Sequence, residues 1–314
     1  MGVGIPAGFR SSERLLSAPP ELYFVVSAVF HYLGPSFAVL LFARVEPLGV
    51  AWLRIASAGA LFALWRRPWR ALRASSREVR RLVASLGVVL AGMNVCFYIA
   101  IDRLPLGTVA AIEFLPVIAL AALGVRTPRN LVALALAVVG VYALVDVRLE
   151  GEPLGVAFAF ANAVLFAAYI VLAHRVARRR ELAPIDGLAA AMLVAAVAVT
   201  PVAGFAAAPA LLDPVALAAG LGVGLASSVI PYVFDQLAMA RLSRATYSLM
   251  VALLPATATV VGIVVLAQIP RAVEIAGVLL VVGAVALHRE RYAPGPSRRG
   301  FQITSQRCPS GSRK

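Results

Sequence analysis

Long, nearly uninterrupted apolar segments restrict the possible folds of this chain more than any other feature. A helix needs about 20 mostly apolar residues to cross roughly 30 Å of hydrocarbon. Only 14% of the residues are charged, against about 25% in soluble domains, so one water-soluble core does not fit the composition. The candidate spans are 22–42, 48–65, 82–101, 106–123, 131–145, 154–173, 185–205, 214–239, 245–266 and 272–287.

The pattern within these segments predicts helices rather than barrel strands. Strands of a membrane barrel alternate apolar and polar residues over about ten positions, whereas 131–139 reads LVALALAVV. We therefore predict an all-α integral membrane protein with ten transmembrane helices. The second, fourth and eighth spans can be divided differently, so nine or eleven helices remain alternatives.

The positions of the basic residues test this division. Cytoplasmic loops carry an excess of Lys and Arg. With the N-terminus inside and the loops alternating, 24 basic residues lie in inside segments and four in outside loops, with Arg54 left within a span. This alternation explains the net charge of +14 by topology and argues against nucleic-acid binding. It predicts that both termini lie in the cytoplasm, and the predominance of Arg among the basic residues indicates a bacterial cell membrane protein.

Short motifs recur in the same order in the two halves of the chain. Each half contains five predicted spans, and an odd number places the second half upside down relative to the first. Inverted repeats are typical of secondary transporters, which bind substrate near the midplane between the repeats. The matching segments are 103–108 with 241–246, 115–116 with 254–255, and 138–144 with 281–287.

These repeats divide the chain into four parts. We expect a cytoplasmic segment at 1–20, a first five-helix repeat at 21–147, a second at 153–288, and a basic disordered tail at 289–314. The sequence contains no Walker loop, hydrolase motif or metal-ligand cluster. We therefore expect neither an enzyme nor a cofactor, and no ATP-driven pump within this chain.

Several segments resemble a known family. The segments are Phe30–Pro35, Phe37–Phe42, Trp52–Ile55 and Ala111–Pro116. With the five-plus-five plan, residues 20–288 resemble the EamA type of the drug/metabolite transporter superfamily, and these segments are closest to its threonine/homoserine exporter branch. The resemblance implies a membrane exporter. The usual Gly-Glu pair before the last helix of each repeat is replaced by 124–125 (Gly-Val) and 267–268 (Ala-Gln).

Two ionisable residues lie well inside predicted spans, where they are costly and mark functional sites by default. At 1.5 Å per residue, Arg54 and Glu113 lie about 9 and 10 Å from the outer ends of their spans, so they can meet. His31 lies on a stripe of small residues in the first span. Polar residues at similar depth complete the candidate set: Asn94, Tyr98, Asn162 and Tyr169.

A free amino acid presents a carboxylate and an ammonium group. Arg54 could bind the carboxylate bidentately while Glu113 accepts the ammonium. His31 could carry a proton, because its ordinary pKa is near neutral. The structural alternatives are an Arg54–Glu113 ion pair that locks two helices, a packing role for His31, and interhelical hydrogen bonds from Asn94 and Asn162.

Two other patterns predict structure rather than function. In the eighth span, small residues at Gly220, Gly224 and Ser228 indicate helix packing, and Pro231 predicts a kink. Glu274 lies one turn after Arg271 at the outer interface, which predicts an exposed local ion pair.

Three functions fit these features. The first is a secondary exporter of amino acids or similar polar metabolites, driven by proton exchange or by the substrate gradient. The second is a transporter of another organic solute or drug, including uptake. The third is a membrane receptor or scaffold that transports nothing. The expected partners are a small-molecule substrate and the lipid bilayer, with protons in the coupled case, and the oligomeric state is left open.

Overall fold

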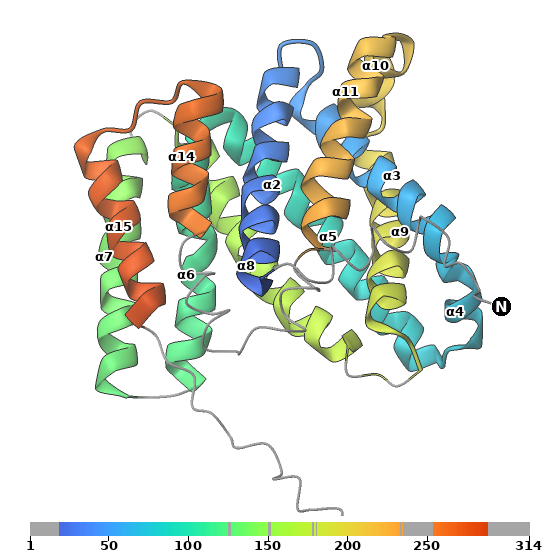
Figure 1. The fold of residues 1–314 in the computed structure, drawn as a ribbon, viewed down its shortest axis with the longest axis horizontal. Helices are drawn as coiled ribbons and strands as arrows, with labels where there is room; N and C mark the ends of the chain where they lie inside the picture. Colours follow the sequence, from blue (N-terminus) through green and yellow to red (C-terminus); the bar gives the residue numbers. More distant parts are fainter. Residues whose placement is uncertain are drawn as a thin grey trace, which may run out of the picture.

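The computed structural model describes residues 19–124, 127–149, 152–177, 179, 181–232, 234 and 254–287. Within these residues all regular elements are helical and there is no strand, which confirms the predicted all-α class (Figure 1). The main helices are α2 (Pro20–Leu41), α3 (Pro47–Arg66), α5 (Arg77–Arg103), α6 (Leu106–Gly124), α7 (Pro128–Leu149), α8 (Pro153–Ala177), α9 (Pro184–Ala203), α11 (Pro214–Gly224), α14 (Leu254–Leu266) and α15 (Ala272–Leu287).

A helix lies at each predicted span, and most bounds agree to within a few residues. Six of them are long and apolar enough to cross a membrane, and four shorter apolar helices accompany them. Ten membrane crossings therefore remain a prediction. Most of the N-terminal segment, the C-terminal tail and the parts of the eighth and ninth spans between 235 and 253 lie outside the described residues.

Two short helices were not predicted, because neither is long enough to span a bilayer. Helix α4 (Pro68–Ala74) follows Arg67, whose φ of 49° is in the left-handed region and turns the chain sharply after α3. Helix α10 (Ala208–Leu212) follows a 3₁₀ turn at the end of α9 and precedes α11. Both connect long helices at the ends of the bundle (Figure 1).

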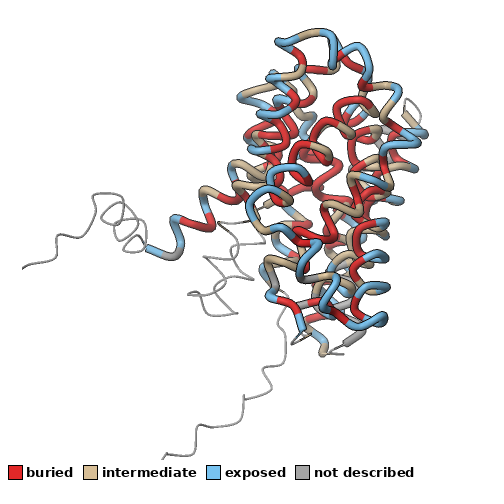
Figure 2. Tube along the Cα trace, turned by 90° about the vertical axis from the view of Figure 1, so that its right-hand side faces the viewer, coloured by how far each residue is buried: buried red, intermediate tan, exposed pale blue. Residues whose placement is uncertain are grey.

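Large apolar side chains cover the outside of the bundle. Leu64, Val164 and Val264 are each at least 65% exposed, which is unfavourable in water but suits contact with lipid tails. Figure 2 shows buried residues along the middle of the bundle and exposed residues around it. The chain is thus a multi-pass membrane protein with its packed interior between the helices.

The most extensive helix contacts join the two halves of the chain. Helix α5 packs on α8 and α9, α3 on α9 and α11, and α7 on α15, the last pair lying side by side in Figure 1. Helix α14 packs on both α2 and α6. The interior is therefore built from both halves, so a site between them draws residues from each.

Small residues let these helices approach closely. A Cβ added at Gly87 of α5 would lie 2.6 Å from Val194 of α9, and one at Gly140 of α7 would lie 2.7 Å from the carbonyl of Gly277. Gly220 similarly faces Leu53. The glycine stripe of α11 is a packing surface, as its spacing predicted.

Two glycines of α11 offer a matched test of this packing. A Cβ at Gly224 would lie 1.8 Å from Ser57 Oγ and 2.9 Å from the Arg54 carbonyl, whereas Gly222 is exposed and nothing lies within 4 Å of its Cβ position. We expect Gly224→Ala to destabilise the protein by about 1–3 kcal/mol through overpacking. Gly222→Ala should be neutral or stabilising by up to about 1 kcal/mol, because alanine favours helix.

Thermal unfolding of both variants in the same detergent measures the difference. A Gly224→Ala protein that melts at or above the Gly222→Ala protein would contradict this account of the α3–α11 contact.

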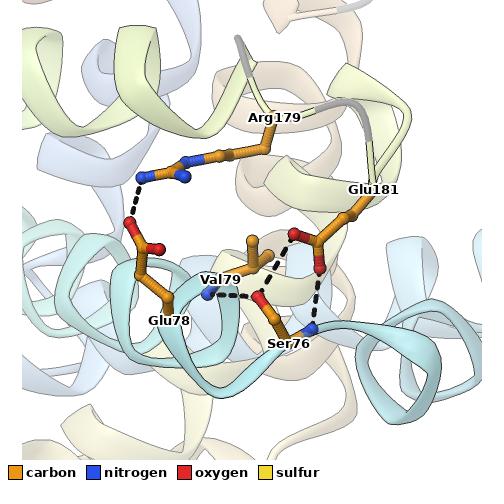
Figure 3. Close-up of polar contacts among 5 residues, drawn as sticks. All are labelled: Ser76, Glu78, Val79, Arg179 and Glu181. Carbon is orange, nitrogen blue, oxygen red and sulfur yellow. Dashed lines mark hydrogen bonds and ion pairs between the residues drawn. The ribbon is translucent and has the colours of Figure 1, made fainter.

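Polar contacts also join the halves at the end of the bundle that carries α4 (Figure 3). Ser76 caps α5, its Oγ accepting from the Val79 N–H at 3.3 Å. Glu181 accepts from the backbone N–H of Ser76 at 2.7 Å and from its hydroxyl at 3.2 Å, and Arg179 forms an ion pair with Glu78. Exposed contacts of this kind contribute little individually, so they hold this end of the halves together weakly.

At the other end, the α2–α3 turn contacts the start of α11. Arg44 Nη1 lies 3.3 Å from Asp213 Oδ2, and Asp213 also caps α11 by accepting from the Val215 N–H. Hydrogen bonds from the backbone N–H groups of Ala216 and Val215, with a smaller effect of Arg44, hold the pKa of the Asp213 carboxyl below its ordinary value. Asp213 therefore stays ionised at neutral pH and keeps both contacts.

Candidate functional site

Arg54 lies on α3 and is 8% exposed. Its Nε donates to Ser228 Oγ and its Nη2 donates to the Ser227 carbonyl, both at 3.1 Å. These partners belong to a single turn of π-helix, η2 (Leu225–Val229), which continues α11. The guanidinium thus links a helix of the first half to a helix of the second.

The sequence explains why η2 offers these acceptors. In a regular helix the Ser227 carbonyl would accept from the N–H of residue 231, but Pro231 has no N–H and its ring crowds that carbonyl. The Ser227 carbonyl therefore has no N–H donor at residue 231, and Arg54 Nη2 donates to it instead. Gly34 of α2 permits the approach of a third helix, since a Cβ there would lie 2.1 Å from Ser227 Oγ.

Tyr98 of α5 lies against the same guanidinium. Its ring centroid is 5.7 Å from the Arg54 guanidinium carbon, within cation–π range. The Tyr98 hydroxyl lies beside Arg54 and Ser227 Oγ, yet neither hydroxyl makes a hydrogen bond of good geometry. Both side chains are fully buried. Buried hydroxyls without partners are rare, because each costs about 1–3 kcal/mol unless a ligand or water satisfies it.

A second polar group lies between α6 and α8. The Asn162 amide is fully buried beside the Glu113 carboxyl, and neither its nitrogen nor its oxygen makes a well-formed hydrogen bond. The aromatic rings of Phe114 and Phe166, 6.3 Å apart, pack the two helices together next to it. This part of the site therefore offers a carboxylate and an amide oxygen, both acceptors.

The two ends of the site are coupled but not in contact. The Glu113 carboxyl lies within electrostatic range of Arg54. Within the part of the chain that the structure describes, no carboxylate forms an ion pair with Arg54. The direct Arg54–Glu113 ion pair considered as a structural alternative is thus not formed in this structure. Among the described residues the buried guanidinium has hydrogen-bond acceptors but no anionic partner at ion-pair distance.

The other predicted residues lie around this pair. His31 is half-buried within electrostatic range of Arg54, with its ring at the edge of Tyr32. Asn94 is buried and donates to the Leu90 carbonyl of its own helix at 2.9 Å, so this amide hydrogen bond joins no second helix. Tyr169 stacks on Phe166, 6.0 Å between centroids.

Sequence reasoning missed Ser227 and the polar role of Ser228. Ser228 was recognised only as part of a packing stripe, and Ser227 not at all. The available signal was the position of Pro231 four residues after a serine inside an apolar span, which predicts a free carbonyl at that serine.

A cavity of about 380 Å³ lies at the end of the bundle where α5 ends and α6 begins. Thr108, Thr259 and Gln268 line it, and Gln268 Oε1 accepts from the N–H of Leu106, the first residue of α6. Thr108 lies five residues before Glu113 on the same helix. None of Arg54, Glu113 and Asn162 lines this cavity, so it is separate from the polar group around Arg54.

Glu274, which also lines this cavity, corrects one prediction. It is 2% exposed rather than exposed, and its Oε2 accepts from the backbone N–H of Arg271 at 2.8 Å. The third residue of a helix commonly bonds back to the N-cap N–H in this way. The charge spacing suggested a side-chain pair, but the free N–H at the start of α15 provides the observed partner.

Comparisons with known proteins give a family and a fold. Residues 153–289 match the EamA-like transporter family. The chain is 31% identical over 255 residues to the threonine/homoserine exporter RhtA of Escherichia coli (strain K12), covering 80% of this chain and 83% of that protein. It is 29% identical over 277 residues to the exporter of the same name from Salmonella typhimurium (strain LT2), covering 87% and 92%. A solved crystal structure, 20% identical, superposes with a TM-score of 0.53 over 85% of this chain and 96% of its own.

Proposed function

Because this chain belongs to the EamA-like transporter family, we propose that it is a secondary exporter of amino acids such as threonine and homoserine. The two relatives described above are threonine/homoserine exporters, and the chain covers most of their length. Identity near 30% supports the transporter class directly, whereas the substrate requires support from the site.

The observation that carries this proposal is that one end of the buried site holds the cationic Arg54 and the other end holds the acidic Glu113. Arg54 offers N–H donors to a carboxylate, and the unpartnered hydroxyls of Tyr98 and Ser227 lie beside it. Glu113 and the Asn162 amide oxygen offer acceptors to an ammonium group. A free amino acid satisfies both ends at once, which a simple anion or cation does not.

The packing pattern supports two inverted repeats that alternate access. If the second half repeats the first upside down, each contact between a first-half helix and a second-half helix has a counterpart. The counterpart joins the equivalent second-half helix to the equivalent first-half helix. Contacts of α5 with α8 correspond to contacts of α11 and η2 with α2, and contacts of α6 with α8 correspond to contacts of α14 with α2. We propose that the two repeats rock about the site that contains Arg54 and Glu113.

Reconstitution tests the function directly. Purified protein in proteoliposomes should exchange labelled threonine for unlabelled threonine or homoserine in a saturable manner. Excess threonine amide, which lacks the carboxylate, should compete weakly.

An imposed pH gradient separates proton exchange, in which His31 is the proposed carrier, from transport driven by the substrate gradient alone. Flux of another solute would favour the second function, and no flux of any solute would favour a receptor or scaffold.

We propose that both termini face the cytoplasm, on the basis of the arginine distribution. Arg73 in α4 would then lie inside and the 88% exposed Leu212 in α10 outside. In a background of Cys96→Ser and Cys308→Ser, a membrane-impermeant maleimide should label Leu212→Cys in intact cells, and Arg73→Cys only after permeabilisation. The reverse pattern would invert the topology.

A further inference from the structure

The hydrogen bonds from Arg54 to η2 use one edge of its guanidinium and leave another edge available for a ligand. Arginine has five N–H donors in a planar fork. Nε and Nη2 share one edge of this plane, and that edge is bound to Ser228 Oγ and the Ser227 carbonyl. The adjacent edge, formed by Nη1 and the second N–H of Nη2, is the one with which arginine makes end-on bidentate contacts with carboxylates. Among the described residues no carboxylate forms an ion pair with it.

Both acceptors are fixed by their surroundings. Ser227 and Ser228 are each at most 2% exposed, and Pro231 has no N–H that could compete with Arg54 for the Ser227 carbonyl. Gly224, one turn earlier, holds the segment against the Arg54 backbone, since a Cβ there would lie 2.9 Å from the Arg54 carbonyl. The guanidinium therefore has two rigid partners on a neighbouring helix.

A long arginine side chain has many rotamers, and fixing it costs free energy that must otherwise be supplied when substrate binds. We infer that Ser228, together with the Ser227 carbonyl freed by Pro231, positions Arg54 so that its free edge is presented to the substrate carboxylate. This inference rests on the proposed function, because it needs Arg54 to bind substrate. Ser228 acts through Arg54 and does not itself need to touch the substrate.

The test measures the half-saturating threonine concentration and the maximal exchange rate in proteoliposomes. Ser228→Ala removes one hydrogen bond to a charged group, and such bonds correspond to about a 10-fold or larger change in affinity. We expect a half-saturating concentration raised about 10-fold, with a maximal rate within about 2-fold of wild type. Ser228→Thr, which keeps the hydroxyl, should restore it to within about 2-fold of wild type.

Pro231→Ala is a second, independent variant. Alanine returns an N–H to the helix, which competes with Arg54 for the Ser227 carbonyl. We expect the half-saturating concentration to rise by a few fold.

The matched control for Ser228→Ala is Ser36→Ala, because Ser36 is a buried serine whose hydroxyl donates only to the Tyr32 carbonyl of its own helix. It should leave the half-saturating concentration unchanged.

The outcomes separate this inference from the function on which it rests. If Arg54→Ala abolishes saturable exchange but Ser228→Ala and Pro231→Ala keep the wild-type half-saturating concentration, the positioning role is wrong and the function stands. If Arg54→Ala itself keeps wild-type exchange, the proposed substrate site is wrong. A purely structural role for Ser228 would lower the melting temperature of Ser228→Ala without moving the half-saturating concentration, which would also overturn the inference.

Discussion

Replacing Arg54 by alanine is expected to abolish saturable amino acid exchange. The guanidinium is the buried cation on which a substrate carboxylate would depend, and removing one partner of a buried, hydrogen-bonded charge pair costs about 2–5 kcal/mol. At 1.4 kcal/mol per factor of ten, affinity for threonine should fall by roughly 30-fold to several thousand-fold. Arg54→Lys keeps the charge but not the two-edged fork, so it should remain strongly impaired.

The measurement is threonine exchange in proteoliposomes at equal amounts of folded protein. Arg44→Ala is the matched control, because Arg44 is 59% exposed and its ion pair with Asp213 lies at the end of the bundle. It should exchange threonine like wild type. Thermal unfolding with and without threonine separates the two roles of Arg54. A structural lock would lose stability but keep the stabilisation by ligand, whereas a binding residue would lose the stabilisation by ligand.

Glu113→Gln should have the second largest effect. The substitution keeps size and shape but removes the negative charge at the end of the site where Asn162 lies. A charge-assisted hydrogen bond to an ammonium group would be replaced by a neutral one of about half its strength. We expect exchange of threonine to fall by about 10-fold or more at substrate concentrations below half-saturation.

Glu46→Gln is the control for this change, since Glu46 is exposed in the turn before α3. It should have no effect on exchange. Wild-type exchange by a correctly folded Glu113→Gln protein would exclude ammonium binding by this carboxylate.

The helical class of this chain could be predicted because each span satisfies a strong local condition. In lipid the backbone must satisfy its own hydrogen bonds, so a run of about 20 apolar residues specifies a helix without knowledge of its neighbours. The predicted span 106–123 and the observed α6 (Leu106–Gly124) differ by one residue for this reason. Arg54 was selected by the cost of an ionisable side chain in lipid and Asn162 by its depth in its span, and both side chains are buried.

The details of the site depend on contacts between helices, and the sequence of a single span does not specify these contacts. The sequence around Arg54 does not predict its hydrogen-bond partners. They are the Ser227 carbonyl, 173 residues away, and the Ser228 hydroxyl, 174 residues away. The π-helical turn arises from Pro231 together with the close packing of Gly34 and Gly224, which involves three helices at once. Glu274 was misassigned because its partner is a backbone N–H, which charge patterns do not include.

The replacement of the Gly-Glu pair by Ala267-Gln268 can now be understood physically. Ala267 has φ of 51°, a conformation that favours glycine, and Gln268 Oε1 accepts from the N–H of Leu106 at the start of α6. Gln268 thus supplies a neutral side-chain oxygen to the N-terminus of α6. Ala267 adopts the left-handed conformation at the energetic cost that a Cβ imposes there.

Arg54 and Glu113 together bear on the electrical behaviour of transport. When both are ionised their charges cancel, and a zwitterionic amino acid adds no net charge to them. Moving one elementary charge through 100 mV corresponds to about 2.3 kcal/mol. A reorientation that carries no net charge would therefore run at the same rate in polarised and depolarised membranes, and any measured voltage dependence would count the additional ions that accompany the substrate.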